Sequence, residues 1–122
     1  MKKIVLLLFV LSLAVSCKKN QLGGKSSVHG KVAHHSRVIP YATVFIKFNA
    51  KEFPGEDTTV YDDKVRADVN GEYSFKCYKG DYYLYGYGFD YAIAAPHIVV
   101  GGTPVRVHSR DDIEIEVAVS ED

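Results

Sequence analysis

Residues 68–75 read Asp-Val-Asn-Gly-Glu-Tyr-Ser-Phe, a turn signal followed at once by a strictly alternating segment. Asn-Gly between two alternating segments is the strongest short-range signal for a β-hairpin. Tyr73, Phe75 and Cys77 alternate with polar residues, so one face of this strand should point into a hydrophobic core. The segment therefore predicts two strands joined by a tight turn at Asn70-Gly71.

The same two-residue period recurs on both sides of this turn, in short segments separated by Gly, Pro, Asn and Asp. Besides Tyr73, Phe75 and Cys77, the residues expected to face the core are Val28, Gly30, Val32, Ala42, Val44, Ile46, Phe48, Val65, Ala67, Val69, Tyr82, Leu84, Gly86, Ile98, Val100, Ile113, Ile115, Val117 and Val119. Seven such segments, with no sustained helical period, predict an all-β fold of two packed sheets. A tight reversal is expected at Lys79-Gly80-Asp81, and a long polar loop over residues 49–59.

Four motifs follow one another along the chain: Gly30-Lys31-Val32, Ile39-Pro40-Tyr41-Ala42-Thr43-Val44, residues 68–75, and Gly80-Asp81-Tyr82-Tyr83-Leu84. In this order they resemble the carboxypeptidase regulatory-like domains, a branch of the prealbumin-like (transthyretin-like) β-sandwiches. The resemblance covers Val28 to about Tyr87. It implies a seven-stranded, Ig-like Greek-key sandwich that acts as a non-catalytic accessory module. The hydroxyisourate hydrolases of this fold end in Tyr-Arg-Gly-Ser, whereas this chain ends in residues 119–122, Val-Ser-Glu-Asp, so no enzyme activity is expected.

The first seventeen residues resemble a bacterial lipoprotein signal. A basic start at Lys2-Lys3 precedes an apolar run from Ile4 to Val15, which is too short to span a bilayer as a helix. Ser16-Cys17 closes the run, and in lipoproteins such a Cys is acylated and becomes the mature N-terminus. Ala14 stands where Leu is usual, a variation found in Bacteroidetes-type bacteria.

This resemblance divides the chain into three parts. Residues 1–16 are expected to be a signal peptide, residues 17–27 the lipidated Cys17 with a flexible tether lacking regular structure, and residues 28–122 the sandwich domain. The expected location is the cell envelope, at the outer membrane, with the membrane as a partner through the lipid on Cys17.

Charge and cysteine content further limit the classes of function that the chain can have. The chain has fifteen Lys and Arg against fifteen Asp and Glu, and loss of Lys2 and Lys3 with the signal leaves a net charge of −2. This balance gives no basis for a nucleic-acid partner, which requires clustered basic charge. With Cys17 acylated, Cys77 is expected to be a free thiol buried in the core.

Tyr83, Tyr85 and Tyr87 should share the outward face of one strand. An exposed aromatic stripe of this kind is a candidate surface for a sugar ring or a protein partner. The alternative is a structural role, in which these rings pair across strands or lie beneath the loop over residues 49–59.

No metal or other cofactor is expected. His34 and His35 are adjacent and should be solvated loop residues, with His29, His97 and His108 at no spacing typical of a zinc site. Asp62-Asp63, Asp68 and Asn70 resemble fragments of a calcium loop but lack its remaining ligands, so Asp68 and Asn70 are expected to be turn formers. The favoured function is a lipid-anchored, non-catalytic binding or structural module. The alternatives are a carbohydrate-binding accessory lipoprotein and, less favoured, a small hydrolase or metal-dependent enzyme.

Overall fold

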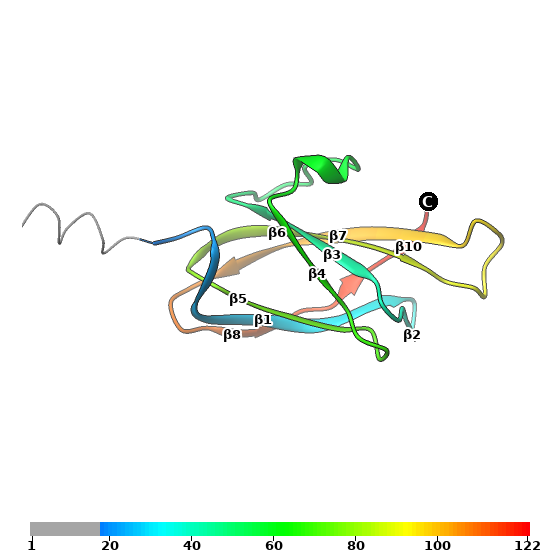
Figure 1. The fold of residues 1–122 in the computed structure, drawn as a ribbon, viewed down its shortest axis with the longest axis horizontal. Helices are drawn as coiled ribbons and strands as arrows, with labels where there is room; N and C mark the ends of the chain where they lie inside the picture. Colours follow the sequence, from blue (N-terminus) through cyan, green and yellow to red (C-terminus); the bar gives the residue numbers. More distant parts are fainter. Residues whose placement is uncertain (1–17) are drawn as a thin grey trace, which may run out of the picture.

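The computed structural model describes residues 18–122, which form an all-β sandwich of two packed sheets (Figure 1). The predicted signal peptide and Cys17 lie outside the described residues. The strands are β1 (Leu22–His34), β2 (Arg37–Val38), β3 (Thr43–Phe48), β4 (Asp63–Arg66), β5 (Glu72–Cys77), β6 (Gly80–Phe89), β7 (Ile98–Val107), β8 (Asp112–Glu114), β9 (Val117–Ala118) and β10 (Ser120–Glu121), with one 3₁₀ turn, η1 (Thr58–Val60). The predicted fold class is confirmed, although residues 18–122 form ten strand segments rather than seven strands. No helix in this part of the chain is long and apolar enough to cross a membrane.

The first sheet is built around β1. Val28 pairs with Phe75 of β5 on one side and with Ile113 of β8 on the other. Further along β1, β2 and β9 take the places of β5 and β8. β8 and β9 run parallel to β1, whereas β2 and β5 run antiparallel to it. The C-terminal part of the chain therefore returns from the second sheet to complete the first.

The second sheet has the order β10-β7-β6-β3-β4, with antiparallel neighbours throughout. β6 lies in its middle and pairs with β7 over its whole length. Tyr82 and Leu84 on the inner face of β6 are completely buried. The inner faces of the two sheets together form the hydrophobic core, as the alternating pattern predicts.

Most residues expected to face the core do so, with two corrections. Ile98 and Val100 were expected inside, but Val99 between them is the buried residue, and Val100 packs on the outer face of the sheet. The phase could not be read there because Ile98, Val99 and Val100 are all apolar and do not alternate. Val69 is exposed because it belongs to a turn rather than to a strand.

The turn at Asn70-Gly71 is confirmed, but its expected hairpin is wrong. The Gly71 N–H donates to the Asp68 carbonyl over 3.0 Å, and Gly71 has a φ of 72°. However, β4 pairs with β3 in one sheet and β5 pairs with β1 in the other. The turn therefore carries the chain between the two sheets instead of joining two paired strands.

The absence of regular structure predicted for residues 17–27 is wrong for Leu22–Ser27, which belong to β1. The phenol of Tyr82 explains the order of this segment. Its oxygen accepts the Gln21 N–H over 2.9 Å, and its O–H donates to the Tyr78 carbonyl over 2.6 Å. Leu22 packs against the core. Among residues 18–122, the buried core side chains come from residues 26–119, so this part of the chain contains a core of its own.

Candidate ligand groove

The aromatic stripe on the outer face of β6 is only partly exposed. Tyr83 is 8% exposed and Tyr85 is 3% exposed, so neither ring presents a free surface. Tyr87, the third residue of the predicted stripe, is half-buried and lies beside an open groove. The alternative of cover by the loop over residues 49–59 is therefore correct for the first two rings.

This cover is made by aromatic side chains from the loop and its end. The ring of Phe53 lies 5.8 Å from that of Tyr83 and 5.5 Å from that of Tyr85, and Tyr61 stacks on Tyr85 at 5.6 Å. The Tyr61 hydroxyl donates to the Gly55 carbonyl over 2.9 Å, which ties the loop to its own base. Burial raises the pKa of Tyr61, Tyr83 and Tyr85, so all three phenols remain protonated at neutral pH.

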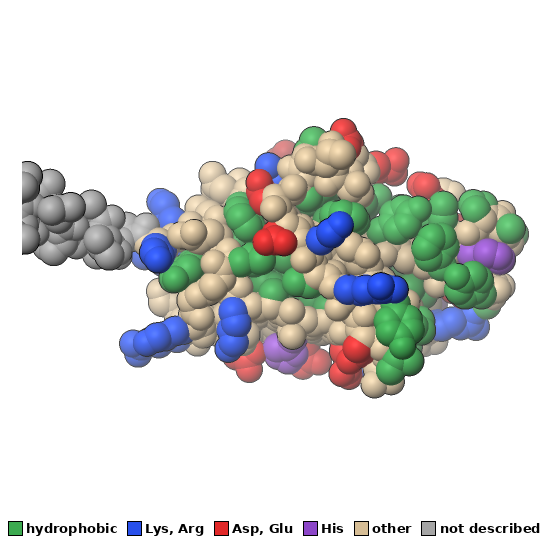
Figure 2. All heavy atoms as spheres, viewed as in Figure 1, with side chains coloured by type: hydrophobic (Ala, Val, Ile, Leu, Met, Phe, Trp, Pro, Cys, Tyr) green, Lys and Arg blue, Asp and Glu red, His purple; other side chains and the backbone are tan. Residues whose placement is uncertain are grey.

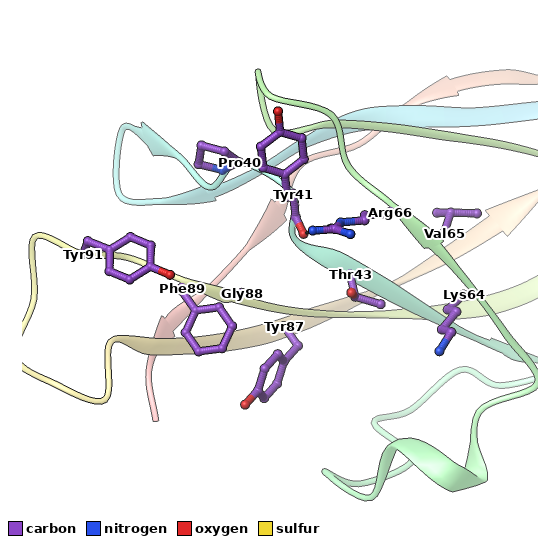
Figure 3. Close-up of a pocket in the computed structure, with 10 residues that line it drawn as sticks. All are labelled: Pro40, Tyr41, Thr43, Lys64, Val65, Arg66, Tyr87, Gly88, Phe89 and Tyr91. Atoms are coloured by element: carbon purple, nitrogen blue, oxygen red, sulfur yellow. Dashed lines mark hydrogen bonds between the residues drawn. The ribbon is translucent and has the colours of Figure 1, made fainter.

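Where the cover ends, the outer face of the sheet opens into a groove of about 830 Å³ (Figure 3). We call it the aromatic groove. Its lining consists of Pro40, Tyr41, Thr43, Lys64, Val65, Arg66, Tyr87, Gly88, Phe89 and Tyr91, from β3, β4, the end of β6 and their connections. Its volume is in the range of small-molecule sites.

One wall of the aromatic groove continues the stripe of β6. The rings of Tyr87 and Phe89 meet edge to face at 5.9 Å, and Phe89 and Tyr91 stack at 6.3 Å. Phe89 is 43% exposed and Tyr91 is 78% exposed. Figure 3 shows these three rings in succession along the groove. Three neighbouring rings with free surface form a platform on which a flat apolar face can lie.

The facing wall combines an aromatic ring with a cation. The guanidinium of Arg66 lies 5.3 Å from the ring centre of Tyr41, and its Nε donates to the Tyr41 carbonyl over 3.4 Å. Tyr41 is 53% exposed and has a φ of 59°, while its N–H donates to the Asp68 carbonyl. The chain thus turns sharply after Pro40 and presents the Tyr41 ring beside Arg66 (Figure 3).

The lining of the groove is mainly aromatic and cationic. It contains two cations, Lys64 and Arg66, several hydroxyls and the aromatic rings, and none of its ten residues is a carboxylate, His, Cys or Ser. This arrangement can stack a ring, donate hydrogen bonds and attract negative charge.

A buried ionic cluster supports the connection that carries Tyr91. His34 was expected to be solvated, but it is buried and its Nδ1 donates to Asp90 Oδ2 over 2.9 Å. Arg37 reaches Asp90 Oδ1 over 3.2 Å, and the same oxygen accepts the Ala92 N–H over 3.0 Å. These bonds lower the pKa of Asp90 to about 2, and the bond from His34 has the largest effect. A single carboxylate therefore joins the β1–β2 turn to the segment after β6.

Tyr41, Phe89, Tyr91, Lys64 and Arg66 were not predicted as a site. Phe89 and Tyr91 continue the odd-numbered alternation of the Tyr stripe, which is the signal that could have extended it. No comparable signal exists for Tyr41, Lys64 and Arg66, since they reach the groove from other strands.

The remaining predicted residues have local roles. Asp68 Oδ1 accepts the N–H groups of Asn70 and Glu72, which confirms Asp68 as a turn former. Cys77 is a buried free thiol, as expected, and burial raises its pKa. Within residues 18–122, no group of three or more His, Cys, Asp or Glu side chains is arranged to hold a metal ion.

Comparison with known proteins supports the fold. The chain resembles a crystal structure from Pseudomonas aeruginosa described as a "putative carbohydrate binding protein", with a TM-score of 0.56 and 14% identity over 81% of this chain and 91% of that one. It also resembles a DUF3823 family protein from Parabacteroides merdae, with a TM-score of 0.49 and 13% identity over 80% of this chain. It spans only 47% of the latter's length. No family model matches the sequence, and neither does any curated protein.

Proposed function

We propose that this chain is a lipid-anchored, non-catalytic binding module of the bacterial cell envelope, and that the aromatic groove is its glycan site. Cys17, at the end of a lipoprotein-type signal, would carry the anchor. The groove is the observation that carries the proposal, because it is a large open hollow lined by partly exposed aromatic rings.

Sugars fit this lining chemically. A pyranose ring has a C–H face that packs on an aromatic ring, while its hydroxyls need hydrogen-bond partners at the rim. The rings of Phe89 and Tyr91 provide the apolar platform, and Thr43, Lys64 and Arg66 provide polar groups nearby. With two cations and no carboxylate in the lining, the groove favours acidic over basic glycans.

The structural neighbour from Pseudomonas aeruginosa is described as a "putative carbohydrate binding protein". At 14% identity the likeness concerns the fold, so the argument for a glycan depends on the groove itself.

A glycan array tests the proposal directly. The domain of residues 18–122 is screened against neutral and acidic glycans, and the affinity of each ligand found is measured by calorimetry. The double substitution Phe89→Ala and Tyr91→Ala should weaken binding about tenfold or more, which corresponds to ~1.4 kcal/mol. Both side chains are substantially exposed, so the thermal melt of the double variant should remain close to that of the parent.

Val60→Ala is the control, because Val60 is an exposed apolar residue outside the groove lining. Glycan binding that persists in the Phe89/Tyr91 variant would place the sugar elsewhere. An array without any bound glycan would contradict the glycan assignment. It would not bear on the lipid anchor, which is tested separately by substitution of Cys17.

A further inference from the structure

The end of the sandwich at which the described chain begins is strongly basic. Two adjoining hollows at this end share Lys79, and Figure 2 shows blue side chains gathered around the start of the described residues. We call this surface the basic end and define it by the six Lys and Arg side chains that line the two hollows: Lys18, Lys19, Lys25, Lys79, Arg106 and Arg110.

The cations of the basic end are exposed and little neutralised. The carboxylate in the lining is Asp81, which lies 3.5 Å from Arg106. The carboxylate of nearby Asp111 accepts a hydrogen bond from the His108 backbone N–H over 2.8 Å. Within residues 18–122, the other five cations have no carboxylate within 4.0 Å. The surface therefore presents positive charge that is available to a partner.

The first residues of this surface are held against the sandwich. The Asn20 N–H donates to the Lys79 carbonyl over 2.9 Å, and the Asn20 side-chain oxygen accepts the Asp81 N–H over 3.1 Å. The Lys18 ammonium lies 5.8 Å from the ring centre of Tyr78. The cations are thus grouped by the fold and not only by their proximity in the sequence.

The basic end and the aromatic groove lie at opposite ends of β6. Gly80 and Asp81 at the start of this strand line a basic hollow, whereas Tyr87, Gly88 and Phe89 at its end line the groove. A strand of ten residues spans roughly 30 Å. In Figure 1 the two ends of β6 accordingly lie towards opposite ends of the molecule.

We infer that the basic end is a membrane-docking surface for anionic lipid headgroups. The inference rests on the proposed anchor at Cys17, because Lys18 follows that residue directly and the anchor would hold this end next to the bilayer. Clustered Lys and Arg beside a lipid anchor add electrostatic attraction to an anionic surface. Docking in this orientation points the aromatic groove away from the membrane, towards glycans outside it.

Vesicle co-sedimentation of residues 18–122, without the lipid, tests the surface on its own. This part of the chain contains a core of its own, and its folding is checked by a thermal melt. The domain should bind vesicles of equal parts phosphatidylglycerol and phosphatidylcholine at low salt, and should not bind vesicles of phosphatidylcholine alone. Since residues 18–122 carry a net charge of −2, binding to an anionic surface requires a local basic patch. Added salt should weaken it, because the screening length falls to about 10 Å at 0.1 M.

Two variants locate the contact. Each Lys near an anionic membrane contributes about a fivefold factor in partitioning, so Lys25→Gln with Lys79→Gln should weaken binding about 30-fold. Lys31→Gln removes one positive charge from β1 beside Glu72, outside both hollows, and should leave binding close to that of the parent.

A loss in Lys31→Gln as large as that in the double variant, or no binding to anionic vesicles, would overturn the docking surface. Binding to inorganic phosphate but not to vesicles would also overturn it. None of these results bears on the glycan array, so failure of the docking surface is distinguishable from failure of the proposed function.

Discussion

Asp90 illustrates how one residue can connect distant parts of this sandwich. Its side chain is nearly inaccessible to solvent, yet it is kept ionised by hydrogen bonds from His34, from the Ala92 N–H and from Arg37. Because these bonds favour the charged form, its pKa is lowered to about 2, below the ordinary value of 3.8. A carboxyl with a lowered pKa stabilises the folded state above its unfolded-state pKa, and this stabilisation is lost as the pH falls through the folded-state value.

We predict that Asp90→Asn lowers the thermal midpoint by several degrees at pH 7. The difference from the parent should shrink as the pH falls from about 4 to about 2, because the parent carboxylate becomes protonated over that range. Melts followed by circular dichroism across this range measure both effects. The control is Asp112→Asn, which removes an exposed carboxylate and should have little effect. A difference that does not depend on pH would contradict the ionic role of Asp90.

At the scale of elements, the turn between β4 and β5 is constrained from two sides. Its hydrogen bonds to Asp68 require Gly71 at a positive φ, which β-branched residues resist. The space around Gly71 is also filled: an added Cβ would lie 3.1 Å from the Cβ of Val38 and 3.2 Å from the Val32 carbonyl oxygen. The turn that carries the chain between the sheets therefore packs closely against β1 and β2.

Gly71→Val should destabilise the domain by ~2–5 kcal/mol, from the left-handed backbone and from overpacking together. Lys76→Val on β5 should change stability by about 0.5 kcal/mol or less, since Lys76 is an exposed strand residue. Midpoints of urea unfolding rank the two variants. A larger loss for Lys76→Val would show that the turn does not depend on the backbone of Gly71.

At the scale of the whole molecule, the two candidate surfaces separate along the long axis. The basic end lies where the described chain begins, at Lys18. The aromatic groove lies roughly 30 Å away, at the far end of β6. A module that is anchored at one end and binds at the other can present its ligand site clear of the surface that carries it.

Replacing Cys17 by Ala should move the protein from the membrane fraction to the soluble fraction or to uncleaved precursor. Two or three acyl chains hold a protein stably at a bilayer, whereas a single chain gives only marginal binding. Fractionation and immunoblotting of cells expressing each variant measure the distribution. Cys77→Ala is the matched control, because that thiol is buried in the sandwich, and it should remain in the membrane fraction. A normally cleaved Cys17→Ala product that stays with the membrane would contradict the anchor.

The sequence predicts some features of the structure correctly and others not. Strand phasing succeeded where apolar and polar residues alternate, as in Tyr73, Phe75 and Cys77, and failed at Ile98 to Val100, where nothing alternates. At the candidate site, the alternating Tyr residues of β6 correctly indicated Tyr87 as a residue of the groove. The burial of Tyr83 and Tyr85 depends on Phe53 and Tyr61, and no local pattern assigns these two residues to that face.

The sequence by itself determined the all-β class, the inner face of most strands and the glycine turn at position 71. These properties follow from side-chain alternation and backbone dihedral preferences, which act over a few residues. Only the tertiary structure decided that this turn joins two sheets, that a loop covers two of the three rings of the Tyr stripe and that Arg66 meets Tyr41. These contacts join segments far apart in the chain, and they depend on which strands pair and how the two sheets stack.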